Sequence, residues 1–202
     1  EAHRGRLEIK SKEGEWTEME YSAVPPPGGR PPKDLLWVPF WRCRTILASS
    51  GEKLETLADL YRLAPPPRVF DPARESRRPI FFYLPAVKFR NPQTIHNLGS
   101  RLTFVQPEVR QGSFEDGSHP LTAGGSLGLK DAQEMGMMIL GALIPQANRR
   151  ARAWAKDCRL EFQDSQLMFF PFTRADLFWK EMTTGVSFQH NALAESLPES
   201  RT

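Results

Sequence analysis

The sequence predicts an α+β protein: a bent, mostly antiparallel sheet with two or three helices packed on one side and long proline-rich loops. Aromatic-apolar runs at 35–49, 80–89 and 167–174 have the composition of buried strands. Other segments repeat their apolar residues at helical spacing. Proline makes up 18 of the 202 residues, nearly twice its usual share of about 5%. Much of it is clustered, which indicates long loops.

Length and composition fit one domain over 1–202, in which folding can bury about 70% of the chain's surface. Hydrophobic residues make up 40% and charged residues 25%, as in soluble globular proteins. Within the domain we expect an N-terminal hairpin (1–24), a proline-glycine linker (25–34), a main body (35–194) and a tail (195–202).

The first elements are expected to be strands. Residues 5–24 alternate between apolar and polar on either side of Gly14, a pattern typical of a β-hairpin with one solvated face. The strand at 35–49 follows the linker and carries Pro39 in its middle. Proline donates no backbone hydrogen bond, so sheets confine it to edges, strand starts or bulges.

Proline has a comparable place in all three aromatic runs, at Pro39, Pro85 and Pro171. We therefore expect three strands that bend or lose pairing at one end. A platform of aromatic rings that binds a ligand or bases is the alternative, but it needs exposed rings beside a basic groove. These runs are too apolar to expose their rings routinely, which favours the sheet core.

Two shorter helices are expected at 51–63 and 91–102. The first repeats its apolar residues at helical spacing, and the second has a capping residue in Asn91 and a proline suited to its first turn. A short strand is expected at 103–109. Long loops are expected at 64–79 and 110–126.

The main helix is expected at 129–157, with a broad apolar stripe. Gly136 and Gly141 weaken it by about 1 kcal/mol each relative to alanine, unless close packing compensates. Pro145 ends or kinks it, and a basic second piece follows. The C-terminal part reads as three strands with a hairpin turn at Thr184-Gly185.

The sequence contains no pattern typical of an active site. Its four histidines do not stand at metal-ligand spacing, and its two cysteines, Cys43 and Cys158, form no CxxC. We expect two reduced thiols and no cofactor or metal. An enzyme with a site around Cys43 or His119 is an alternative, in which Arg42 and Arg44, on either side of Cys43, would lower its pKa.

Two basic clusters are the candidate binding residues. They comprise Arg74, Arg77 and Arg78 in the first long loop and Arg149, Arg150, Arg152 and Lys156 on the helical extension. Such clusters suit an acidic partner or phosphates. The net charge is only +3, and acids and bases are interspersed, so a solvated surface is the simpler interpretation.

Some apolar motifs resemble a set of uncharacterised bacterial proteins. The motifs are "GRLE" near the start, "LLWVPFWRCR" and "IFFYLPAVKF". In those proteins a zinc ribbon precedes a domain with a "P-F-W" strand and a later "P-A" strand. The resemblance spans roughly 5–193. It implies no reaction, and the ribbon cysteines are absent from this chain.

The expected function is that of a non-catalytic interaction or scaffold subunit of a larger assembly. Long proline-rich loops are poorly explained in a free-standing domain and well explained if they drape over a partner. The alternative is an accessory nucleic-acid-binding protein that uses the two arginine clusters on one face. No apolar stretch is long enough to span a membrane. We expect a cytoplasmic location, with an upstream segment or cleaved leader left open because the chain begins at Glu1.

Overall fold

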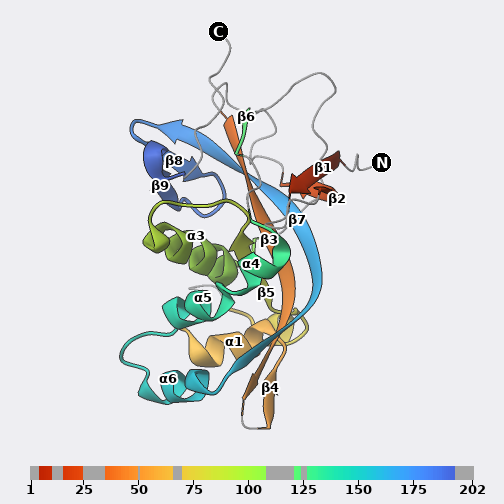
Figure 1. Ribbon diagram of the computed structural model, residues 1–202. Coiled ribbons are helices and arrows are strands. Elements are labelled where there is room, and N and C mark those ends of the chain that lie inside the picture. Colours follow the sequence, from red (N-terminus) through yellow and green to blue (C-terminus); the bar gives the residue numbers. More distant parts are fainter. Residues whose placement is uncertain are drawn as a thin grey trace.

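Two long antiparallel strands, β3 (Leu35–Ser49) and β7 (Arg159–Ala175), form the centre of the fold. The computed structural model describes residues 5–10, 16–24, 35–49, 51–65, 70–107, 121–123 and 127–193. In Figure 1, β3 (orange) and β7 (blue) form a bent ribbon along which the helices are stacked. A shift in register between Cys43 and Thr45 interrupts the pairing of the two strands.

Shorter strands extend this pair into one sheet with the order β1-β2-β7-β3-β4 and side branches. Most pairs are antiparallel, while β2 runs parallel to β7 and β6 parallel to β3. The shorter strands are β1 (Gly5–Lys10), β2 (Trp16–Ala23), β4 (Glu52–Leu54), β5 (Phe81–Pro85), β6 (Leu121–Thr122), β8 (Phe178–Glu181) and β9 (Ser187–Gln189). The helices are α1 (Leu57–Leu63), α2 (Pro72–Glu75), α3 (Pro92–Val105), α4 (Leu129–Gln133), α5 (Gly136–Leu143) and α6 (Arg149–Lys156).

The α+β class and the bent, mostly antiparallel sheet are thus confirmed. The hairpin of β1 and β2 and the three C-terminal strands β7, β8 and β9 are also present as expected. Gly185 adopts a φ of 73° in the turn between β8 and β9, which glycine allows at low cost. The expected linker at 25–34, the tail at 195–202 and most of the loop at 110–126 lie outside the residues that the structure describes.

The prolines of the two long strands stand where a flanking strand is exchanged for another. Ala86 N donates to Pro39 O (3.0 Å), so Pro39 turns its nitrogen toward the same outer edge. On that edge β6 pairs with β3 only as far as Trp37, and the pairing of β3 with β5 begins at Phe40. The missing N–H of Pro39 therefore falls in the gap between two partners.

Pro171 repeats this arrangement on β7. Its carbonyl accepts from Met182 N (3.1 Å) on the outer edge. There β2 pairs with β7 up to Phe169 and β8 pairs from Phe172 onward. Pro85 is the last residue of β5. In β3 and β7 the expected loss of pairing at one end is replaced by a change of outer neighbour, while the two strands stay paired with each other at both prolines.

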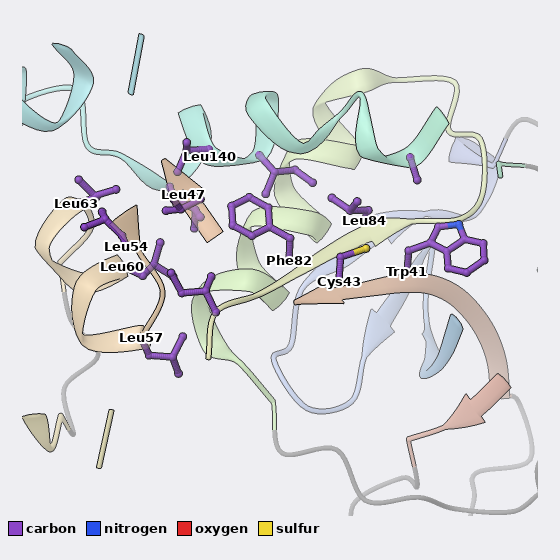
Figure 2. Packing of buried hydrophobic residues seen from close by; sticks show 14 of the residues in the cluster. Trp41, Cys43, Leu47, Leu54, Leu57, Leu60, Leu63, Phe82, Leu84 and Leu140 are labelled. Carbon is purple, nitrogen blue, oxygen red and sulfur yellow. The ribbon is translucent and has the colours of Figure 1, made fainter. Parts of the chain in front are cut away.

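Apolar side chains cover both faces of the central strands. Neighbouring residues of a strand point to opposite faces, and β3 supplies one cluster with Trp37, Trp41 and Cys43 and another with Val38 and Phe40. Residues of α1, α4, α5 and α6 join the first cluster, whereas α3 and the β8–β9 hairpin join the second. The helices thus divide between the two clusters and pack around the sheet, whereas the sequence analysis expected them on one side. Figure 2 shows part of the first cluster, with Cys43 enclosed among large apolar side chains.

The expected helix at 51–63 is shorter in the structure. Residues Glu52–Leu54 form β4 and pair with the end of β3. The helix starts only after Thr56, whose hydroxyl accepts from Asp59 N while the Asp59 carboxylate accepts from Thr56 N. This reciprocal capping box fixes the start of α1. Asn91 caps α3 as expected, accepting from Gln93 N (2.9 Å).

The expected strand at 103–109 is wrong at its start, because Thr103 to Val105 belong to α3. These residues nevertheless serve the sheet. Thr103 Oγ1 accepts from Tyr83 N (3.0 Å), and the Gln106 side chain accepts from Phe81 N (3.2 Å). The last turn of α3 therefore supplies hydrogen bonds that a neighbouring strand would otherwise give to the edge of β5.

The expected main helix at 129–157 is divided into α4, α5 and α6. The first break lies before Gly136, where an added Cβ would lie 2.6 Å from Leu160 Cδ1 and 2.8 Å from Phe162 Cζ. Close packing against β7 therefore accounts for this glycine. Pro145 follows the end of α5, as expected of a residue that cannot continue a helix. The division, together with the short α2 inside the expected loop at 64–79, raises the helix count above the expected two or three.

Candidate partner-binding groove

Helix α5 carries no polar side chain on any face. Its sequence is GMMILGAL. Gly136, Ile139, Leu140 and Leu143 are buried, as expected for the face toward the core. The opposite side presents Met137, 40% exposed, together with exposed Gly141 and Ala142. A surface helix normally carries polar residues toward solvent, so this apolar outer face needs an explanation.

A groove of about 230 Å³ runs between α5 and α6. Apolar groups line most of the groove, and two cationic side chains from α6 complete its lining. The lining residues are Met137, Leu140, Gly141, Ile144, Arg152, Ala155 and Lys156. At Gly141 an added Cβ would meet nothing within 4 Å, so the space beside this residue is open.

Helix α6 is held in place from both ends, which gives the groove a defined second wall. At its start Asn148 accepts from Ala151 N (3.0 Å) and donates to Leu63 O (3.3 Å). Near its end Trp154 donates its ring N–H to Glu52 (3.1 Å). Two separate parts of the chain, β4 and the end of α1, therefore hold α6 in position.

The cations at the groove are available to a partner. Arg152 donates to Gln146 Oε1 (2.9 Å). Within the described part of the chain, neither Arg152 nor Lys156 forms an ion pair with a carboxylate. The groove thus combines an apolar floor with two positive charges that have no internal counterion there.

The second basic cluster predicted from the sequence therefore contributes two of its four members to the groove. Arg149 and Arg150 are exposed in the first turn of α6 and do not line it. Sequence reasoning missed the apolar lining. The signal was present, because an eight-residue helical segment without polar residues is unusual at a surface.

The first basic cluster lies around α2 and is engaged internally. Arg78 donates to both carboxylate oxygens of Glu75 (3.1 Å each) and to Gln106 O (3.2 Å). Arg74 also lies near Glu75, at 4.0 Å, whereas Arg77 is exposed. No hydrogen bond or ion pair between described residues joins this cluster to α6.

The expectation that Arg42 and Arg44 would lower the pKa of Cys43 is wrong. Burial raises the pKa of Cys43 to about 11, although a hydrogen bond from Ser165 (3.4 Å) acts in the opposite direction. The guanidinium of Arg42 is directed elsewhere: it lies 3.4 Å from the centre of the Phe81 ring and donates to the Tyr83 hydroxyl (3.3 Å).

Both cysteines are free and buried, and burial raises the pKa of Cys158 to about 11 as well. His119 lies outside the described residues. Among the residues that the structure describes, no three His, Cys, Asp or Glu side chains are placed to hold a metal ion. No helix there is long and apolar enough to cross a membrane.

We expect both thiols to resist alkylation in the native protein. At pH 8 a thiol of pKa about 11 is ionised in only about one molecule in a thousand, and the thiolate is the reactive form. Mass spectrometry should show that iodoacetamide modifies both cysteines about a hundredfold more slowly in the native protein in buffer than in the unfolded protein in urea. Labelling of either cysteine at the same rate in both conditions would contradict the burial.

Comparisons with protein-family models, curated proteins and solved structures found no match to this chain. The resemblance to proteins with a zinc ribbon therefore stays an expectation.

Proposed function

We propose that this protein is a non-catalytic subunit of a larger assembly that binds another protein through the groove between α5 and α6. The observation that carries the proposal is the outer face of α5, where Met137, Gly141 and Ala142 are exposed on a helix without polar residues. Covering such a face removes apolar area from water, which contributes roughly 25 cal/mol for each Å². The free, buried cysteines are compatible with a cytoplasmic assembly.

The partner we propose is a segment with apolar side chains and a flanking carboxylate. The apolar side chains would lie on Leu140, Gly141 and Ile144, and the carboxylate would pair with Arg152 or Lys156. Desolvation at the groove makes such a pair stronger than one on an open surface. Proline-rich loops that drape over the same partner remain part of the proposal.

Nucleic acid is the second candidate, and the arginines of α6 favour it. Phosphate binding, however, uses cations along a solvated track rather than around an apolar floor. In the first cluster the guanidinium of Arg78 already binds Glu75 and a carbonyl group. These contacts make a protein partner the better-supported proposal.

The variant Gly141→Leu tests the proposal without harming the fold. Leucine fills the open space beside Gly141 and stabilises the helix through its higher propensity by at most about 0.8 kcal/mol. We expect a melting temperature equal to or above that of the wild type, with partner affinity reduced at least about tenfold. The measurement is native mass spectrometry of the tagged protein from its own cells, followed by titration with the purified partner.

Ala153→Leu is the matched control, because Ala153 is exposed on α6 but does not line the groove. The Ala153→Leu protein should bind the partner with the affinity of the wild type. A complex that survives Gly141→Leu unchanged would assign binding to another surface, and a bare mass of 23.0 kDa would argue against an assembly subunit. A bound component that nuclease removes would favour the nucleic-acid alternative.

A further inference from the structure

A second hollow, of about 720 Å³, lies between α3, the end of α5 and the turn from β8 to β9. It is wide and open to solvent. One face of α3 forms a wall through Asn97, Ser100, Arg101 and Phe104. The residues of the turn, ending with Ser187, form the facing wall. A hollow of this shape suits a chain that lies along it rather than an enclosed small molecule.

The strand β9 has a free edge, and its first residue, Ser187, lines this cleft. Glu181 N donates to Val186 O (2.7 Å) and His190 N to Leu177 O (3.0 Å), so the residues that flank β9 direct these backbone groups toward β8. By the alternation of an antiparallel pair, Phe188 between them does the same. Ser187 and Gln189 therefore direct theirs away from β8. Of the strands that the structure describes, only β8 pairs with β9. Both Ser187 and Gln189 are exposed.

The turn that leads into this edge is held rigidly. The carboxylate of Glu181 is fully buried and accepts from Thr183 N (3.0 Å) and Thr184 Oγ1 (2.7 Å). It also accepts from Thr184 N. A strand edge that is fixed before binding loses little conformational entropy when a new strand is added.

The charge of the cleft indicates what that strand carries. Arg101 is exposed and forms no ion pair with any residue that the structure describes. Phe104 and Leu143 provide apolar contacts in the same hollow. An arginine beside apolar surface favours a carboxylate, which its guanidinium binds through two parallel hydrogen bonds.

We infer that the cleft between α3 and β9 binds an extended polypeptide segment, which adds as a strand to β9 and places an acidic side chain at Arg101. Main-chain hydrogen bonds to Ser187 and Gln189 supply affinity, and the alternate side chains that enter the cleft supply specificity. The inference concerns a surface separate from the groove of α5 and α6, so either can fail while the other stands.

The probe is a library of random short peptides displayed on phage, selected on the full-length wild-type chain. We expect enriched sequences with an acidic residue among alternating apolar ones. The enriched peptide should bind Ser187→Pro at least about tenfold more weakly, because proline removes the outward N–H, and Ser187→Ala as well as the wild type. The Arg101→Glu variant should also bind the peptide about tenfold more weakly. The Lys130→Glu variant, with the same charge change on an exposed residue of α4, should bind it as the wild type does.

Hydrogen exchange provides the direct readout of strand addition. In the free protein the amides of Ser187 and Gln189 should exchange much faster than that of His190, and the bound peptide should protect both. Protection at these two amides supports the inference. Failure to enrich any peptide, equal binding to Arg101→Glu, or binding without protection of either amide would overturn it.

Discussion

Replacing Phe170 by alanine is expected to lower the free energy of unfolding by about 3–5 kcal/mol. Phe170 is fully buried in the C-terminal half of β7. Its ring meets those of Phe40 and Tyr83 edge to face, at centroid distances of 5.4 and 5.6 Å. The shorter side chain loses this burial and leaves a cavity between two strands that cannot close around it. Urea denaturation followed by tryptophan fluorescence measures the loss.

Phe178→Ala is the matched control, because Phe178 is 42% exposed at the start of β8. This variant should lower the free energy of unfolding far less than Phe170→Ala does. A double-mutant cycle of Phe170→Ala with Phe40→Ala should yield a coupling of about 0.5–1.5 kcal/mol from the ring contact. If Phe170→Ala cost no more than Phe178→Ala, the second apolar cluster would not be the packed core that the structure shows.

The strands could be predicted from the sequence because their signals are local. Alternation on either side of Gly14 and the turn at Thr184-Gly185 each define a hairpin within a few residues. The capping residue Asn91 likewise marks the start of α3. What could not be predicted depends on contacts between distant segments, such as the pairing of β2 with β7. The need for glycine at position 136 is of the same kind, since an added Cβ there would overlap Leu160 and Phe162.

The prolines show how a local rule can be correct and still incomplete. The rule that proline avoids the hydrogen-bonded interior of a sheet predicted that the strands with Pro39 and Pro171 bend or lose pairing at one end. It did not predict that both would lie in the two central strands. Their missing donors are harmless there because the outer neighbour changes at those positions, from β6 to β5 and from β2 to β8.

The candidate site was predictable only in part, for a similar reason. Charge runs are visible in sequence, so Arg152 and Lys156 could be named in advance. Their apolar counterparts Leu140 and Ile144 have the composition of core residues, and only the angle between α5 and α6 makes them the floor of a groove. Arg101 and Ser187 could not be linked from the sequence either, because only the tertiary structure places α3 opposite the turn between β8 and β9.

The two hollows have α5 in common. The groove uses Gly141 and Ile144, while the cleft uses Ala142 and Leu143, so the outer side of α5 is the ridge between them. One partner that crosses this ridge would reach the cations of α6 and Arg101 together. Linked sites of this kind gain affinity through effective concentration without any new contact. A weak interaction in each hollow would then suffice for a stable complex.

Two glycines on neighbouring helices should respond in opposite directions to the same substitution. Gly99→Ala is expected to lower the free energy of unfolding by about 1–2 kcal/mol, because overpacking costs about 1–3 kcal/mol and exceeds the gain in helix propensity. A Cβ on Gly99 would overlap Ile139 Cδ1, and it would lie 2.9 Å from Ile139 Cγ1 and 3.1 Å from Tyr83 O. Ile139 is fully buried and Tyr83 O belongs to the backbone of β5, so neither can move freely.

In Gly141→Ala the added Cβ meets no other atom within 4 Å. This variant should therefore raise the free energy of unfolding by about 0.5–1 kcal/mol through helix propensity alone. Urea denaturation of both variants gives the two signs in one experiment. Stabilisation by Gly99→Ala would show that α3 does not approach α5 and β5 as closely as described. Destabilisation by Gly141→Ala would mean that the space beside α5 is filled, and with it the groove proposed to hold a partner.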